Sequence, residues 1–221
     1  MRIHDVSKLA VVALCAALVG CATSRSEIKV GAAAAAPTTV AVTKSRAILI
    51  RNVTDERVFE QKPSEPNIPS LGFEGAAGAT AETKARAIAR KRNTFGAALG
   101  DILLENGQTV TGVVKASLTT AFGEAGYKVT SNPADAGQSP IVIDVRIKKF
   151  WSWFKPGFWA LTLSADIATD LEVQTLGAPL IVSVHAEDSR QIATDSAWVE
   201  VIDKALKEFR TQALAKAASL P

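Results

Sequence analysis

The alternation of apolar and polar residues along the second half of the chain predicts three successive β-strands. Residues 141–149 place apolar side chains at odd-numbered positions, and residues 159–174 keep the same period of two. A third apolar run, residues 180–187, follows a short link that contains Gly177 and Pro179. This period is that of a strand with one buried and one solvated face. We therefore predict an antiparallel three-stranded meander.

Two segments show the three-and-four spacing of apolar residues that is typical of an amphipathic helix. The first runs from Thr109 to Ala125, and Gly126 supplies the left-handed residue that ends a helix. The second runs from about Asp195 to Ser219, and polar residues at its start suit an N-cap. These are the two main helices that we predict.

The first half of the globular region has weaker patterns. Residues 47–53 suit a strand, and a loop rich in proline and glycine follows up to about residue 80. Residues 81–92 suit a short helix with a thin apolar stripe, and residues 100–107 suit a short strand that ends in an Asn-Gly turn. The predicted fold class is α+β: the meander and an N-terminal strand form an antiparallel sheet, and both main helices pack on one face.

The stretch KKFWSWFKPGFW, residues 148–159, contains six of the chain's 13 aromatic residues. Residues paired across an antiparallel ladder point to the same face, so matching the apolar positions of the two strands requires paired residue numbers with an even sum. A three-residue loop, Lys155-Pro156-Gly157, satisfies this condition, whereas a two-residue Pro156-Gly157 turn requires a bulge. The three-residue loop pairs Phe154 with Phe158. It continues the core face with the tryptophans and puts the phenylalanines on the polar face.

Three roles for this aromatic hairpin remain open. Its side chains could complete the core beneath the loop of residues 60–80, form a surface for a partner protein or self-association, or contact lipid headgroups or glycans. The candidate contact residues are Phe150, Trp151, Trp153, Phe154, Phe158 and Trp159.

The N-terminus has the features of a bacterial secretory signal. Arg2 and Lys8 precede an apolar run of about ten residues, which is too short to span a bilayer. The run ends in Leu18-Val19-Gly20-Cys21, which resembles the lipobox of bacterial lipoproteins. The resemblance implies cleavage after Gly20 and acyl chains on Cys21, and the alternative is an ordinary cysteine beyond an ordinary cleavage site. Ala22, in place of an aspartate, implies sorting to the outer membrane.

The predicted organisation has three parts. Residues 1–20 are the signal peptide, residues 21–44 are the lipidated cysteine and a flexible tether of small and polar residues, and residues 45–221 are one α+β domain. The mature chain has 23 basic and 21 acidic residues, a balance that selects no partner by charge. With Cys15 removed and Cys21 acylated, no thiol is left for a disulfide.

No familiar catalytic or metal-binding motif is present. His185 shares a strand face with Ser183 and Glu187, but a single strand histidine is usually structural. Asp166, Asp170 and Glu172 alternate along one strand and suit a solvated face, with a catalytic pair as the alternative. We therefore expect a non-enzyme without cofactor or metal.

The only dense basic cluster suits either a solvated helix face or a contact for lipid phosphates and other anions. Its members are Lys84, Arg86, Arg90, Lys91 and Arg92. We expect no nucleic acid as partner because of the predicted compartment.

The order of parts resembles the YajG-like family of envelope lipoproteins. The lipobox is followed by the strand in RAILIRNVTDER, a long loop, a helix that closes as AFGEAGYKV, the strand IVIDVRI and a terminal helix. The resemblance implies an envelope location and a non-enzymatic role. We predict a lipid-anchored protein on the periplasmic face of the outer membrane, its acyl chains in the inner leaflet, that acts as an interaction or assembly module through its sheet edge or hairpin tip. It would contact envelope proteins or a second copy of itself. The alternative is an accessory lipoprotein of a transenvelope lipid transport system.

Overall fold

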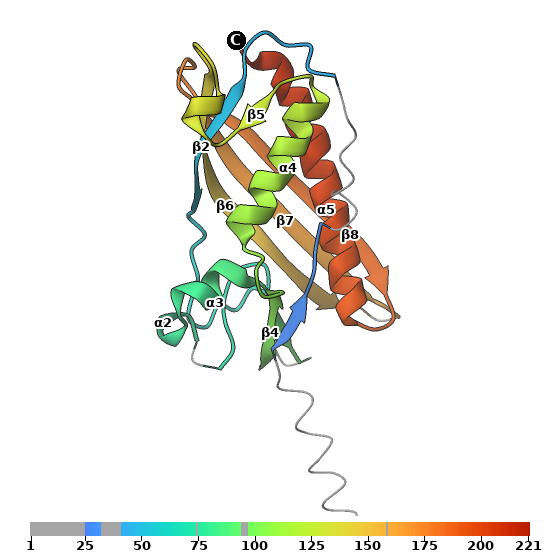
Figure 1. The fold of residues 1–221 in the computed structure, drawn as a ribbon. Helices are drawn as coiled ribbons and strands as arrows, with labels where there is room; N and C mark the ends of the chain where they lie inside the picture. Colours follow the sequence, from blue (N-terminus) through green and yellow to red (C-terminus); the bar gives the residue numbers. More distant parts are fainter. Residues whose placement is uncertain (1–24, 32–40, 74, 94–96, 158) are drawn as a thin grey trace, which may run out of the picture.

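The computed structural model describes residues 25–31, 41–73, 75–93, 97–157 and 159–221. Within them, eight strands form one curled sheet, and helices α4 and α5 lie side by side across one of its faces (Figure 1). The strands are β1 Ser26–Ile28, β2 Ile48–Asp55, β3 Ala87–Arg92, β4 Ala98–Leu104, β5 Val129–Thr130, β6 Ile141–Pro156, β7 Leu161–Val173 and β8 Leu180–Arg190. The helices are α2 Gly75–Gly78, α3 Ala81–Arg86, α4 Val110–Glu124 and α5 Asp195–Lys216, with short 3-10 turns at Pro133–Asp135 and Ala217–Ser219.

The predicted meander is confirmed, but the prediction of a purely antiparallel sheet is wrong. Strands β6, β7 and β8 are antiparallel neighbours, whereas β2 pairs with β6 in parallel. The chain between β2 and β6 contains α3, β3, β4 and α4, and such a long connection returns the chain in the same direction. A period of two indicates which residues are buried and carries no information on strand direction. The sheet is therefore mixed.

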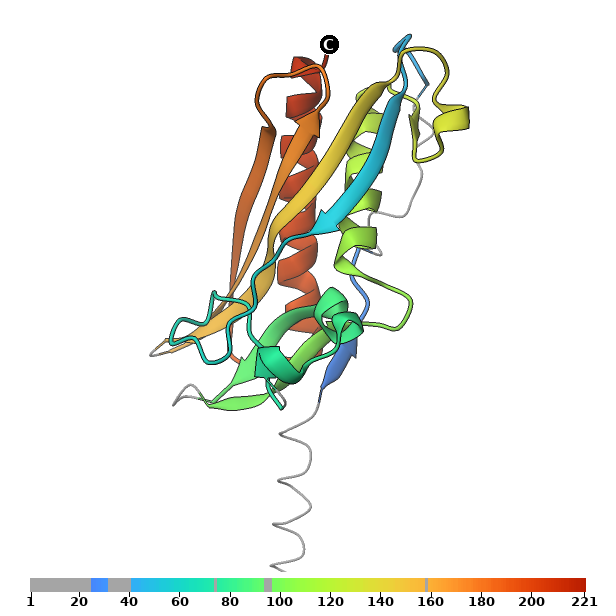
Figure 2. The same cartoon turned by 90° about the vertical axis from the view of Figure 1, so that its left-hand side faces the viewer.

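Strand β6 divides the sheet along its length. One edge of β6 pairs with β7 throughout, whereas the other pairs first with β2 and then, at Ser152, with Ala89 of β3. Strands β3, β4 and β1 continue from this second half and form the lower part of the molecule in Figure 2. The sheet therefore forks where β2 ends and β3 begins.

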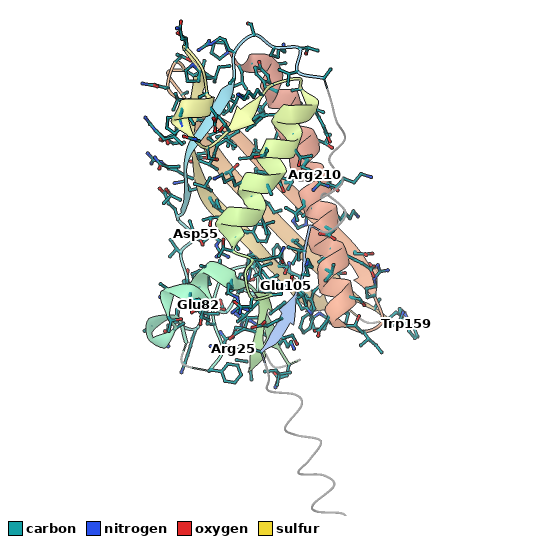
Figure 3. The ribbon with its side chains drawn as sticks, viewed as in Figure 1. Arg25, Asp55, Glu82, Glu105, Trp159 and Arg210 are labelled. Atoms are coloured by element: carbon teal, nitrogen blue, oxygen red, sulfur yellow. The ribbon has the colours of Figure 1, made fainter. Side chains whose placement is uncertain are left out.

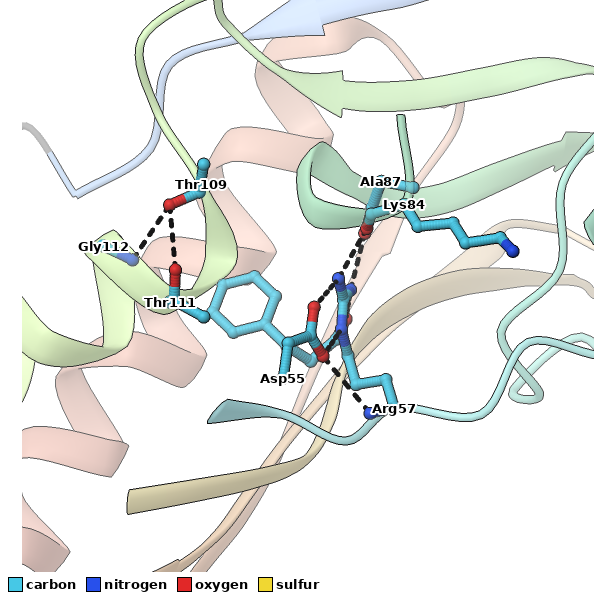
Figure 4. Close-up of polar contacts among 8 residues, drawn as sticks. Asp55, Arg57, Lys84, Ala87, Thr109, Thr111 and Gly112 are labelled. Atoms are coloured by element: carbon cyan, nitrogen blue, oxygen red, sulfur yellow. Dashed lines mark hydrogen bonds and ion pairs between the residues drawn. The ribbon is translucent and has the colours of Figure 1, made fainter. Parts of the chain in front are cut away.

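The buried side chain of Arg57 closes this fork (Figure 4). Its guanidinium donates to the carbonyls of Lys84, Ala87 and Phe150 at 2.7, 2.6 and 3.0 Å, and it pairs with the Asp55 carboxylate. Arg57 thus supplies donors to carbonyl groups of α3, β3 and β6 at the point where the strands diverge.

The two main helices begin and end where the sequence predicts. The Thr109 hydroxyl accepts a hydrogen bond from the Gly112 N–H at 3.1 Å and caps α4, and Gly126 after its end has a φ of +87°. The Thr194 hydroxyl caps α5 in the same way, through the Ala197 N–H at 3.3 Å. Local hydrogen bonds fix these ends, which is why the sequence predicts them well.

Two segments of the first half differ from the prediction. Residues 81–92 form a helix only up to Arg86, and residues 87–92 form β3, because Ala87, Ile88 and Ala89 are buried within the sheet. The predicted tether, residues 21–44, contains β1, which pairs in parallel with β4. The signal peptide and Cys21 lie outside the described residues.

A bulge at Lys148 sets the register of the β6–β7 hairpin. Before it, Ile147 pairs with Thr169, and after it, Lys149 pairs with Ala168, so the sum of paired numbers changes from even to odd. The predicted three-residue loop and its pairing of Phe154 with Phe158 are therefore wrong. Strand β6 reaches Pro156, which pairs with Leu161, and the Gly157 N–H donates to the Ala160 carbonyl at 2.9 Å across the turn.

The bulge also exchanges the faces of the aromatic residues, because one extra residue inverts the alternation that follows it. Phe150 and Phe154 join the main core between the sheet and the helices. Trp151 and Trp153 point to the opposite face and form a second core with Leu71, which belongs to the long loop. The prediction was the reverse of this: it placed the tryptophans on the core face and the phenylalanines on the polar face.

No helix in the described part of the chain is long and apolar enough to cross a membrane.

Candidate functional site

The six candidate aromatic residues separate into buried and exposed positions. Phe150, Trp151 and Trp153 are buried, and Phe154 is half-buried against Trp198 of α5. Trp159 alone among the five that are described is exposed, with 83% of its surface accessible, and Phe158 lies outside the described residues. The hypothesis of a contact surface therefore narrows to the turn of the hairpin.

Ile192 is a second exposed apolar residue at the same end of the sheet, with 71% of its surface accessible. The last pair of the β7–β8 ladder is Leu161 with Arg190, and both Trp159 and Ile192 lie two residues beyond it. We call Trp159 and Ile192 the tip patch. Figure 3 shows Trp159 at the same lower end of the molecule as Arg25, the first described residue. Ile192 was not predicted, because one apolar residue in a loop has no periodic neighbours.

Side chains of both charges lie near the tip patch, with Lys155 and Arg190 as the basic residues. Asp188, Asp195 and Glu200 lie on or beside the connection from β8 to α5. The Arg190 guanidinium pairs with both Asp188 and Glu200. Ion-paired charges of both signs beside exposed apolar side chains resemble the polar rim of a protein interface.

The free edge of β8 is partly covered by α5. The Ser183 N–H donates to the Gln212 side chain at 2.9 Å, and the Lys204 ammonium donates to the Glu187 carbonyl at 2.8 Å. Helix α5 thus occupies backbone groups that another strand would need in order to pair here. Sheet-edge docking, one of the two predicted modes, is disfavoured on this side.

His185 is held between two carboxylates. Its Nδ1 lies 2.5 Å from Asp166 Oδ1 and its Nε2 lies 3.1 Å from Glu187 Oε1, while the Lys149 ammonium pairs with the other Asp166 oxygen at 2.6 Å. The hydrogen bond to Asp166 raises the pKa of His185, and Glu187 adds to this effect. An imidazole with an acidic partner at each nitrogen is stabilised as a cation and is poorly suited to act as a general base. The serine near the pair, Ser164, donates to Glu187 at 3.3 Å instead.

The carboxylates that alternate along β7 are engaged in ion pairs. Asp170 lies 3.8 Å from the Lys148 ammonium, and Glu172 lies 2.8 Å from the Arg146 guanidinium. These contacts suit a solvated face crossed by ion pairs, which is the simpler of the two predicted roles.

The fold disperses the five basic residues of the predicted anion contact. Arg86 donates to the Leu104 carbonyl and pairs with Glu27, and Lys91 donates to the Ser26 hydroxyl. Lys84 lies on α3, where its carbonyl accepts a hydrogen bond from Arg57. Only Arg90 and Arg92 come together.

Arg90 and Arg92 share one hydroxyl group. Arg90 Nη1 and Arg92 Nη2 lie 3.3 and 3.4 Å from the Oγ of the buried Ser70, and Arg92 Nη1 donates to the Pro63 carbonyl at 3.1 Å. Desolvation lowers the pKa of both guanidinium groups, and the Arg90 charge lowers that of Arg92 further. Ser70 was not predicted, because only the tertiary fold brings the long loop to β3.

A small apolar cavity lies between α4 and the segment after β1. Its volume is about 320 Å³, and its lining includes Val30, Gln108, Val113, Ala116 and Thr120. Gln108 accepts from the Val30 N–H and donates to the Val30 carbonyl, which fixes one wall. The lipid-transport alternative would use such a space, and this volume is near the lower end of the range for small-molecule sites.

Comparison with known proteins does not identify the chain. No protein-family model and no curated protein matches it. A solved structure of a protein described as uncharacterized is 12% identical, covers 89% of this chain and 97% of its own, and has a TM-score of 0.39. A minor lipoprotein from Acinetobacter baumannii is 14% identical, covers 52% of this chain and 91% of its own, and has a TM-score of 0.35. Both TM-scores are too low to establish a shared fold, so the resemblance to the YajG-like family stays a prediction.

Proposed function

We propose that this chain is a lipid-anchored, periplasm-facing envelope protein whose domain is a non-catalytic interaction module. The lipobox at residues 18–21 supports the anchor. Arg25 lies four positions after Cys21, so their Cα atoms are at most about 14 Å apart. The lower end of the domain, with Arg25 and Trp159, would therefore lie close to the acylated membrane surface (Figure 3).

The main support for an interaction role is the exposure of the tip patch. Trp159 projects from the turn of a hairpin whose other described aromatic residues are buried or half-buried, and Ile192 adds a second exposed apolar side chain at that end. Tryptophan is enriched among residues that dominate binding energy at protein interfaces. The ion-paired charges of both signs around the tip patch suit the polar rim of a protein interface, so we take another envelope protein as the partner. The fold would then act as a rigid support that presents the turn.

Site-specific photo-crosslinking in cells tests this role. A photoreactive amino acid replaces Trp159 in the full lipidated chain, and the control carries it at Ile181, which is exposed at the opposite end of β8. We expect a discrete protein adduct from position 159 that position 181 does not give, and a Trp159→Ser substitution in a second tagged copy should not compete for it. Adducts with lipid only, or equal adducts at both positions, would exclude the tip patch as a protein contact.

The anchor has its own test. A Cys21→Ser chain should be released from membranes and should incorporate no labelled acyl chain, because the sulfur that carries the diacylglycerol is absent. Sucrose-gradient separation of the two membranes then locates the wild-type chain. Membrane retention of the Cys21→Ser chain together with acyl labelling would refute the anchor.

A further inference from the structure

Arg90 and Arg92 are two positively charged side chains with an incomplete set of partners. They lie two residues apart on β3, so they share one face of the sheet. The Nε atoms of both are buried and have no hydrogen-bond partner. Among the described residues, no carboxylate lies within ion-pair distance of either guanidinium, and their bonds go to Ser70 and the Pro63 carbonyl.

Two carboxylates act on this pair beyond ion-pair distance, Asp101 on Arg90 and Glu65 on Arg92. Asp101 pairs with Arg90 in the β3–β4 register, but its buried carboxylate accepts from Arg25 Nε at 3.2 Å and from the Gly72 N–H at 2.7 Å. It therefore acts on Arg90 only at longer range. Two half-buried cations beside each other repel, and burial without a directly paired counter-charge is unfavourable. Residues that served packing alone would not need these charges.

A tetrahedral oxyanion would satisfy this arrangement. A guanidinium presents a planar fork of N–H donors that matches two oxygens of a phosphate, and two guanidinium groups can bind one phosphate from two sides. Both side chains are of intermediate exposure, so an anion can reach them from solvent. A charged ligand would also offset the repulsion that lowers the pKa of Arg92.

The position of the pair indicates the source of the phosphate. Asp101 lies opposite Arg90 in the β3–β4 ladder and its carboxylate pairs with Arg25, which is four residues from Cys21. We propose that Arg90 and Arg92 bind the phosphate group of a phospholipid headgroup in the membrane that holds the acyl chains of Cys21. The choice of lipid rests on the proposed anchor, whereas the phosphate site itself does not.

The first experiment uses inorganic phosphate and the full chain with Cys21→Ser, so that no acyl chain contributes. The thermal unfolding midpoint is followed against phosphate at constant ionic strength, with chloride as the balancing anion. We expect the midpoint to rise with phosphate, and the apparent affinity to fall by about tenfold or more in an Arg90→Gln/Arg92→Gln variant. A Lys62→Gln/Lys207→Gln variant removes the same charge from exposed positions and should behave as the wild type.

The single variant Arg92→Gln and phosphorus NMR of the phosphate line keep the test valid if the double variant does not fold. Line broadening by the wild-type chain should weaken in Arg92→Gln and persist in Lys62→Gln. Equal phosphate effects on wild type and on both arginine variants would overturn the site.

The second experiment identifies the source with the same lipid-free chains. Vesicles of phosphatidylcholine with phosphatidylglycerol should co-sediment the Cys21→Ser chain that keeps both arginines. Added inorganic phosphate and the double arginine substitution should each reduce the fraction of protein that co-sediments. Binding of inorganic phosphate without vesicle binding would overturn the headgroup assignment. Because these chains carry no acyl group, a failed anchor would appear only in the Cys21→Ser release assay described above.

Discussion

Arg57 donates to both carboxylate oxygens of Asp55, at 2.8 and 2.7 Å, although the Arg57 side chain has no exposed surface. The two residues stand at the end of β2, where β6 changes its neighbour from β2 to β3. This salt bridge, between residues two positions apart, fixes the Arg57 guanidinium, which donates hydrogen bonds to three carbonyl groups at the fork. The loop that covers Trp151 and Trp153 starts directly after it.

Replacing Arg57 with methionine should lower the free energy of unfolding by about 3–5 kcal/mol, the usual result of removing one partner of a buried pair. The reason is that the Asp55 carboxylate loses its paired guanidinium and three carbonyl groups lose a donor at the same time. Urea denaturation measures the change. Arg51→Met removes an exposed guanidinium that pairs with Asp144 and should have little effect. If the two variants lost the same stability, Arg57 would not hold the fork.

Two glycines three residues apart should respond in opposite directions to alanine. Gly126 has a φ of +87°, and an added Cβ would meet the Thr43 hydroxyl at 2.2 Å, so Gly126→Ala should cost about 1–2 kcal/mol or more. Gly123 lies within α4 with open space around it, so Gly123→Ala should gain about 0.5–1 kcal/mol. Thermal unfolding of both variants gives the comparison. A stabilising Gly126→Ala would contradict the left-handed end of α4.

The tryptophans of the hairpin should differ sharply in their contributions to stability. Trp151 is buried in the second core and its indole N–H donates to the Pro66 carbonyl at 3.1 Å, so Trp151→Ala should cost about 3–5 kcal/mol. Trp159→Ala should leave stability unchanged, because the side chain is exposed.

Acrylamide quenching provides the matching optical test. The chain has four tryptophans, and Trp151, Trp153 and Trp198 are buried. Trp159→Phe should therefore remove most of the quencher-accessible fluorescence. Unchanged quenching would mean that Trp159 is covered in solution.

The His185 cluster predicts a specific pH dependence of stability. Asp166 raises the folded-state pKa of His185 above the ordinary value of 6.5, so the stabilisation from His185 is complete below pH 6.5 and is lost as pH rises through the folded pKa. The pKa of Glu187 is lowered from 4.5 by the same contacts, so its stabilisation is lost as pH falls through its folded pKa. The stability difference between wild type and His185→Gln should therefore be largest between about pH 4.5 and 6.5.

Proton NMR can follow the imidazole directly, since His185 is the only histidine after residue 20. The titration midpoint should lie above the ordinary histidine value and fall in Asp166→Asn. Lys149 and Glu187, which also face the cluster, stay unchanged in that variant. A midpoint that Asp166→Asn does not move would show that the contact is absent in solution.

Much of the secondary structure could be predicted because it depends on neighbours in the chain. The three strands of the meander and helices α4 and α5 follow from the period of their apolar residues, and Thr109 and Gly126 mark the ends of α4 through local hydrogen bonds and backbone conformation. The predicted short strand before the Asn-Gly turn is confirmed as β4 for the same reason.

The candidate contacts were less predictable because they depend on a single extra residue. The bulge at Lys148 leaves the alternation on each side of it intact, so no local pattern reveals it, but it moves Trp151 and Trp153 from one face of the sheet to the other. The sum of paired residue numbers is even before the bulge, as predicted, and odd after it. Burial of the tryptophans follows from that change.

The sequence by itself determined the periodic elements, the ends of the two helices and the lipobox motif, because each depends on residues within one or two helical turns of each other. Only the tertiary structure decided strand direction, the fork held by Arg57, the exposure of Trp159, and the pairing of Arg90 with Arg92 beside Ser70. These features depend on which distant segments share a face, and that is set by packing of the whole chain.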